Sequence, residues 1–213
     1  MKNSLFGPIQ DYCDARILEI DRISALRKSI LEQISMYIVS KRRLQSDIKL
    51  LFVCTHNSRR SHFGQIWATI AATYFDLNHI FSYSCGTETT AMHPNAIAAL
   101  CRVGMKIDMD DSIINPICTV SFGEKLVVTC FSKTYDHMSL PKSNFSAIMT
   151  CSEAEENCPY IPGVDFRIAT TYEDPKHFDG TTLEKEKYDE RCLQIAREML
   201  YVMYFTTKNL RFD

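Results

Sequence analysis

The chain has 213 residues, of which 46% are hydrophobic and 23% charged, with 7 glycines and 7 prolines. This length and composition fit one folded domain with an appendage, and they exclude a disordered, collagen-like or disulfide-scaffold chain. The 24 Lys and Arg residues nearly balance the 26 Asp and Glu residues. The overall charge therefore gives no reason to expect nucleic acid or an anionic membrane as a partner.

The cysteines and the N-terminal residues bear on the cellular compartment. The 9 cysteines are an odd number at irregular spacings, in a chain too large to need disulfide stapling. The N-terminus has neither an apolar core nor a small-residue cleavage site of an export signal, and no stretch approaches 18 uncharged apolar residues. We therefore expect a cytoplasmic protein with reduced thiols and no membrane span.

Residues 14–43 carry apolar side chains at intervals of three and four, with charged residues between them. This spacing predicts one or two amphipathic helices. We expect residues 1–46 to form an N-terminal helical extension and residues 47–213 to form the catalytic domain. The apolar stripe of the extension has two possible uses, which are packing on the rest of the chain and forming a homodimer interface.

From residue 49 onward, strand patterns alternate with helix patterns. Residues 49–53 are a short apolar run, which is typical of a strand buried on both faces. The elements expected after it are a helix over 61–75, a strand over 80–84, a helix over 94–103, strands over 126–131 and 147–150, and a helix over 188–205. This alternation predicts an α/β fold with a doubly wound, mostly parallel sheet of four to five strands flanked by helices.

The segment from Cys54 to Ser61, CTHNSRRS, lies between the first strand and the first helix of this domain. The backbone N–H groups of a loop at that junction, together with the helix N-terminus, suit a tetrahedral oxyanion. The same groups and Arg60 favour the thiolate form of Cys54, and the Ser61 hydroxyl could donate to it. We expect Cys54 to be the nucleophile and Arg60 to hold two oxygens of the substrate. The full set of expected substrate-binding residues is Thr55, His56, Asn57, Ser58, Arg59 and Arg60.

The positions of Cys54, Asn57, Arg60 and Ser61 resemble the signature loop of the low-molecular-weight protein tyrosine phosphatase fold family. Members of that family carry a general acid Asp followed by Pro late in the chain, and Asp174-Pro175 occupies the matching place here. The resemblance implies that Asp174 protonates the leaving oxygen.

A second cysteine pair, Cys151 and Cys158, follows the strand expected over residues 147–150. On a helix these thiols would lie on one face, roughly 10 Å apart, too far to bond without local unwinding. The pair, followed by Pro159, resembles that of thioredoxin-coupled arsenate reductases. The resemblance implies that Cys54 attacks arsenate, that Cys151 then attacks Cys54, and that a Cys151–Cys158 disulfide is reduced by thioredoxin. It implies no bound cofactor, and the Cys-x6-Cys spacing gives no reason to expect a metal.

Two other functions remain open. The first is a low-molecular-weight protein tyrosine phosphatase that hydrolyses phosphate esters through a cysteinyl-phosphate, which would leave Cys151 and Cys158 idle. The second is a non-catalytic oxyanion-binding or interaction module, because His56 stands where the family usually has Gly and could obstruct the thiol. Arg59 also departs from the family, which often has Cys there. Four other histidines lack a ligand-like spacing and are expected at the surface or at helix caps, namely His62, His79, His137 and His177.

Overall fold

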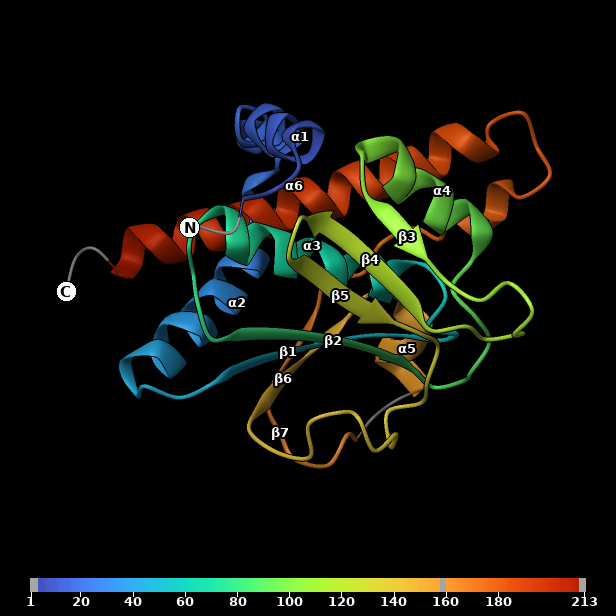
Figure 1. Cartoon of the computed structure of the whole chain (residues 1–213). Coiled ribbons are helices and arrows are strands. Elements are labelled where there is room, and N and C mark those ends of the chain that lie inside the picture. Colours follow the sequence, from blue (N-terminus) through green and yellow to red (C-terminus); the bar gives the residue numbers. More distant parts are fainter. Residues whose placement is uncertain (1–3, 158–159, 211–213) are drawn as a thin grey trace.

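The computed structural model describes residues 4–157 and 160–210. Four strands, β1 (Ile48–Cys54), β2 (Ile80–Gly86), β6 (Phe145–Met149) and β7 (Val164–Ala169), form a parallel sheet in the order β2-β1-β6-β7. A separate antiparallel sheet contains β3 (Lys106–Asp108), β4 (Cys118–Gly123) and β5 (Leu126–Cys130). Figure 1 shows the two sheets with the helices around them.

The helices are α1 (Gly7–Ile17), α2 (Ala25–Arg43), α3 (Arg60–Tyr74), α4 (Pro94–Val103), α5 (Ser152–Asn157) and α6 (Glu184–Leu210). Two short 3-10 turns are η1 (Ile20–Arg22) and η2 (Pro175–Phe178). None of the helices in the described part of the chain is both long and apolar enough to cross a bilayer.

Strand β1 has a core on each of its faces. Leu50 and Phe52 belong to one buried cluster, which also includes residues of α3 and α6. Leu51 and Val53 point to the opposite face, where they join a second cluster with Ala154 of α5. Burial on both faces explains why the β1 sequence is almost continuously apolar. The predicted α/β fold, a mostly parallel sheet with flanking helices, is confirmed.

The N-terminal helices pack on α6 within the same chain (Figure 1). Leu31, Ile34 and Ile38 of α2 are buried in the larger cluster together with residues of α6. A buried hydrogen bond of 2.8 Å also joins the hydroxyls of Ser35 in α2 and Thr206 in α6. Of the two uses considered for the apolar stripe, packing on the rest of the chain is therefore the one observed within this protomer.

The strand expected over residues 126–131 belongs to the second sheet rather than to the parallel one. β5 follows β4 after a connection of only two residues, Glu124 and Lys125, which is long enough for an antiparallel hairpin but not for a parallel crossover. Its burial also alternates, and Val127 is 55% exposed, unlike a central parallel strand. β3, β4 and β7 were not predicted, because β3 is only three residues long and the other two lack a continuous apolar run.

Gly64 allows α3 to lie directly on β1. A Cβ atom at this position would lie 2.7 Å from Cγ of the buried Phe52 ring. We expect Gly64→Ala to reduce the free energy of unfolding by about 1–3 kcal/mol through overpacking, despite the better helix propensity of Ala. Urea denaturation would measure the change. Gly7→Ala is the matched control because its added methyl meets no atom within 4 Å, and equal stabilities for the two variants would contradict the prediction.

Candidate active site

Cys54 is the last residue of β1, and its side chain is held at the base of the loop that leads into α3. Its Sγ lies 3.1 Å from the Oγ of Ser61, and that oxygen also accepts a 2.8 Å hydrogen bond from the side-chain amide of Asn57. Since Asn57 already donates to the Ser61 oxygen, the hydroxyl proton of Ser61 is available to donate to sulfur. The three side chains thus form a chain of hydrogen bonds that ends at the Cys54 sulfur.

Asn57 also fixes the loop backbone. Its φ angle is 45°, in the left-handed region that Asn tolerates better than most residues. Its side-chain oxygen accepts a 2.9 Å hydrogen bond from the backbone N–H of Lys133, just after β5. The second sheet, which the sequence did not predict, therefore supports the loop directly.

The carbonyl groups of the loop are held by the segments around it. The Thr55 carbonyl accepts from Glu88 N at 2.8 Å, the His56 carbonyl from Ser132 Oγ at 2.9 Å, and the Ser58 carbonyl from His93 N at 3.0 Å. Because the N–H of a trans peptide points away from its carbonyl, these outward bonds direct the N–H groups that follow toward the inside of the loop. That orientation suits the binding of an oxyanion.

Gly86, at the end of β2, allows the close approach on which these bonds depend. A Cβ atom there would lie 2.7 Å from the backbone nitrogen of Asn57 and would also clash with the Thr55 carbonyl.

Arg60 and Asp174 lie side by side although they are 114 residues apart in sequence. Arg60 Nη2 donates to Asp174 Oδ2 at 2.6 Å, and Nη1 donates to the Tyr172 carbonyl at 2.8 Å. Asp174 also caps η2, because its Oδ1 accepts from the backbone N–H of Lys176 at 3.1 Å. The fold thus brings the expected general acid to the arginine of the loop.

Cys151 lies beside the loop at the carboxyl end of β6. Its Sγ is 3.5 Å from Thr55 Oγ1 and accepts a 3.3 Å hydrogen bond from the backbone of Ala154 in α5. Cys54 and Cys151 belong to the same buried cluster. Burial raises the pKa of the Cys151 thiol, while the Thr55 hydroxyl and Arg60 oppose that rise. Cys158 lies outside the described residues.

Among solved structures, the fold is similar to a low-molecular-weight phosphotyrosine phosphatase from Vibrio cholerae O395, with a TM-score of 0.50, 14% identity, and coverage of 77% of this chain and 97% of that one. The arsenate reductase of Staphylococcus aureus strain Newman is 30% identical over 114 residues, which are 53% of this chain and 67% of the relative. The chain belongs to the arsenate reductase family of this fold. A Halalkalibacterium halodurans arsenate reductase is 26% identical over 137 residues, 64% of this chain and 80% of the relative. No family model matches.

Arg59 and His56, the two departures from the family loop, each have side-chain partners within the protein. The Arg59 guanidinium donates to Tyr188 Oη at 2.6 Å and to Asp179 Oδ2 at 3.1 Å. The negative charge of Asp179 thus compensates Arg59, so this side chain adds little net positive potential for a substrate. The His56 ring lies 3.4 Å from Glu88, and 39% of its side chain is exposed.

The hydroxyls of two other expected binding residues, Ser58 and Thr55, have partners within the protein. Ser58 donates its hydroxyl to the Ala91 carbonyl at 2.7 Å, and Thr55 places its hydroxyl against Cys151. For Ser58 in particular, the backbone rather than the side chain is left to meet an oxyanion.

Two buried polar residues near the loop, Lys133 and His62, were missed in the sequence. Lys133 is buried, and its ammonium donates to the Phe131 carbonyl at 3.0 Å and lies 4.1 Å from the Phe131 ring centroid. His62, expected at the surface or at a cap, is fully buried with Nδ1 3.1 Å from Ser84 Oγ. The only sequence signal for His62 was its place in the first turn of a helix whose surroundings are apolar, which does not distinguish a buried face from an exposed one.

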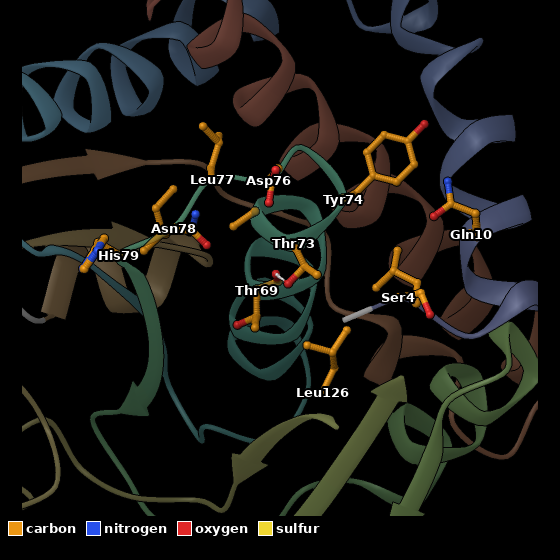
Figure 2. A pocket seen from close by; sticks show the side chains of 13 residues that line it. Ser4, Gln10, Thr69, Thr73, Tyr74, Asp76, Leu77, Asn78, His79 and Leu126 are labelled. Carbon is orange, nitrogen blue, oxygen red and sulfur yellow. Dashed lines mark hydrogen bonds between the residues drawn. The ribbon is translucent and has the colours of Figure 1, made fainter. Parts of the chain in front are cut away.

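Two cavities differ in their relation to this loop. One of about 310 Å³ is lined by His56, Ser58 and Arg59 together with residues 90–94 and Lys176. A larger cavity of about 500 Å³ lies at the opposite end of the sheet, where α3 ends and β2 begins (Figure 2). Its hydroxyls at Thr69 and Thr73 donate to carbonyls of their own helix, and Tyr74 donates to Asp14. The hydroxyls of Thr69, Thr73 and Tyr74 in the larger cavity are therefore already engaged within the protein.

The buried His62 predicts a pH dependence of stability. Burial, with a smaller contribution from nearby Lys133, lowers the pKa of His62 to about 3 from an ordinary value of 6.5. Below pH 6.5 the unfolded chain takes up a proton that the folded chain does not, so the free energy of unfolding falls by up to about 1.4 kcal/mol per pH unit.

We expect His62→Gln to flatten this decline between pH 6.5 and pH 4.5 in urea denaturation. His79→Asn is the matched control, because His79 is exposed and has a φ of 62° that Asn tolerates. An unchanged slope in His62→Gln would contradict the assignment of the decline to this ring.

Proposed function

We propose that the protein reduces arsenate to arsenite through a relay of cysteine thiols. The proposal rests chiefly on one arrangement, in which the nucleophile candidate Cys54 shares its loop with Arg60 and has Cys151 against the neighbouring Thr55. Relatives named arsenate reductase support the same chemistry.

In the first step the loop N–H groups and Arg60 hold arsenate, and Cys54 attacks the arsenic atom. A sulfur–arsenic bond forms as an arsenic–oxygen bond breaks, and Asp174 supplies a proton so that the oxygen leaves as water. The incoming oxyanion competes with Asp174 for Nη2 of Arg60. Substrate binding would thereby release the Asp174 carboxyl from its ion pair and leave it next to the departing oxygen.

In the second step Cys151 attacks the sulfur of Cys54. A Cys54–Cys151 disulfide forms, and the electron pair of the sulfur–arsenic bond leaves with arsenic, which becomes arsenite. The two thiols lose two electrons and arsenic gains two. Burial favours the protonated form of Cys151, so this thiol must lose its proton before it attacks.

Regeneration follows by thiol–disulfide exchange. Cys158 attacks Cys151 and frees Cys54, and thioredoxin reduces the Cys151–Cys158 disulfide. This part of the proposal comes from the sequence pattern around Cys158, and it requires a reducing compartment such as the cytoplasm. No bound cofactor is needed, because the electrons come from thiols.

Hydrolysis of phosphate esters is a second candidate. Cys54, Arg60 and Asp174 already supply a nucleophile, an oxyanion ligand and an acid without Cys151. The first half of both reactions is the same, and water replaces Cys151 in the second half. The need for Cys151 therefore distinguishes a reductase from a phosphatase.

Substitution of the relay cysteines tests the reductase. With arsenate, thioredoxin, thioredoxin reductase and NADPH, we expect Cys54→Ser and Cys151→Ser each to lower turnover by at least about 10³-fold, because each removes a reacting sulfur. NADPH consumption provides the measurement. Cys101→Ser is the matched control, since Cys101 is exposed on α4. Full activity of Cys151→Ser would rule out the relay, and hydrolysis of aryl phosphate by a wild type that is silent with arsenate would favour the phosphatase.

Replacement of the acid gives a separate expectation. Asp174→Asn keeps the shape of the side chain but removes its proton, so turnover should fall by about 10²–10⁴-fold. The neighbouring Glu173→Gln is the matched control, because the Glu173 side chain is 63% exposed and pairs with Arg191. Steady-state rates with arsenate and with an aryl phosphate would measure both variants, and equal rates for the two variants would exclude Asp174 as the acid.

A further inference from the structure

Two consecutive arginines of the loop hold opposite ends of one short segment. Arg60 pairs with Asp174, which precedes η2, at 2.6 Å. Arg59 pairs with Asp179, which follows η2, at 3.1 Å. The 3-10 turn between the two aspartates begins at Pro175 and is capped by Asp174 itself. Because the turn is short and capped, the position of Asp179 constrains the position of Asp174.

Tyr188 of α6 completes the contact at the Asp179 end. Its hydroxyl accepts from Arg59 Nε at 2.6 Å and donates to Asp179 Oδ1 at 2.8 Å. The His93 ring stacks on Tyr188 with centroids 5.4 Å apart, at the N-terminus of α4. Arg59 is 9% exposed and Tyr188 is fully buried. A charge buried to this degree is tolerated because it is paired and hydrogen-bonded.

The other end of the segment is anchored to the sheet. Thr170 N donates to the Met149 carbonyl at 2.8 Å, and Tyr172 N donates to the Thr150 carbonyl at 3.0 Å. Asp174 therefore lies on a span that is fixed to β6 on one side and to Arg59 and Tyr188 on the other. Its own contact with Arg60 is the one that a bound oxyanion would compete for.

We propose that Arg59 is a positioning residue, which acts through Asp179 to hold Asp174 where it can protonate the leaving oxygen once the substrate occupies Arg60. The inference rests on the proposed function, since it assumes that Asp174 is the acid. The positioning role accounts for the presence of Arg59 in the loop, because its guanidinium contacts Asp179 at the end of the segment that carries Asp174.

A misplaced general acid changes the ratio of kcat/KM between esters with poor and good leaving groups, whereas a general loss of binding does not. Phenyl phosphate has a poor leaving group and depends on the acid, whereas 4-nitrophenyl phosphate has a good leaving group and depends on it much less. We expect Arg59→Met and Asp179→Asn to lower kcat/KM for phenyl phosphate about 10-fold more than for 4-nitrophenyl phosphate, and Asp174→Asn to show a larger difference of the same kind. The rate at which iodoacetamide alkylates Cys54 should stay near that of the wild type, because the loop remains intact.

Two further variants guard against misfolding as an explanation. The double variant Arg59→Met/Asp179→Asn removes both charges and leaves neither unpaired. Its effect should not exceed that of either single variant, because all three variants break the same Arg59–Asp179 ion pair. Arg102→Met breaks another Arg–Asp pair, between α4 and Asp189 of α6 at 2.6 Å, and should leave the ratio of the two esters unchanged.

The outcomes separate this inference from the proposed function. Equal losses with both esters in Arg59→Met would overturn the positioning role while the proposed function stands. If the esters turn over too slowly to compare, the pH profile of kcat/KM for arsenate replaces them, and the fall at high pH that a general acid produces should flatten in Arg59→Met. An unchanged profile would overturn the inference. A wild type inactive toward arsenate and both esters would overturn the proposed function and this inference with it.

Discussion

Strand β1 pairs in parallel with β2 on one side and β6 on the other, so the carboxyl ends of three strands meet at one edge of the sheet. Cys54 ends β1, Gly86 ends β2, and Cys151 follows β6 by two residues. The parallel register therefore brings the candidate nucleophile, the glycine that admits the loop, and the second thiol to the same edge of the sheet. The remaining groups of the site are attached to this edge.

Charge pairing then connects the edge of the sheet to the helical layer. Glu198 of α6 is 2% exposed and accepts from Arg27 of α2 and from the hydroxyl of Tyr172, each at 2.8 Å. Arg27 also donates to the Thr170 carbonyl at 3.2 Å. Thr170 and Tyr172 lie shortly before Asp174 in the sequence. Helix α2 therefore supports the segment that carries the expected acid. Helix α2 is thus part of the framework of the site.

The second sheet has a comparable role on the other side of the loop. Ser132 and Lys133, which follow β5, bind the His56 carbonyl and the Asn57 side chain. Asn57 in turn donates to Ser61, which lies against Cys54. A hairpin remote in sequence therefore helps to set the hydrogen bonds around the sulfur. Buried polar groups of this kind are stable only as a satisfied network, so changes at β4 or β5 are expected to reach the loop.

Local sequence determined the apolar run of β1, the amphipathic helices and the Cys-x5-Arg loop between strand and helix, because each depends on spacing within a few residues. It also marked Asp174 and Cys151 as candidates through the family resemblance. Only the tertiary structure decided that residues 126–130 belong to a separate antiparallel sheet, that His62 is buried, and that Arg59 binds Asp179 and Tyr188. These outcomes depend on partners as far as 129 residues away, and a side chain's spacing in the sequence does not say which of its possible partners the fold brings within hydrogen-bonding distance.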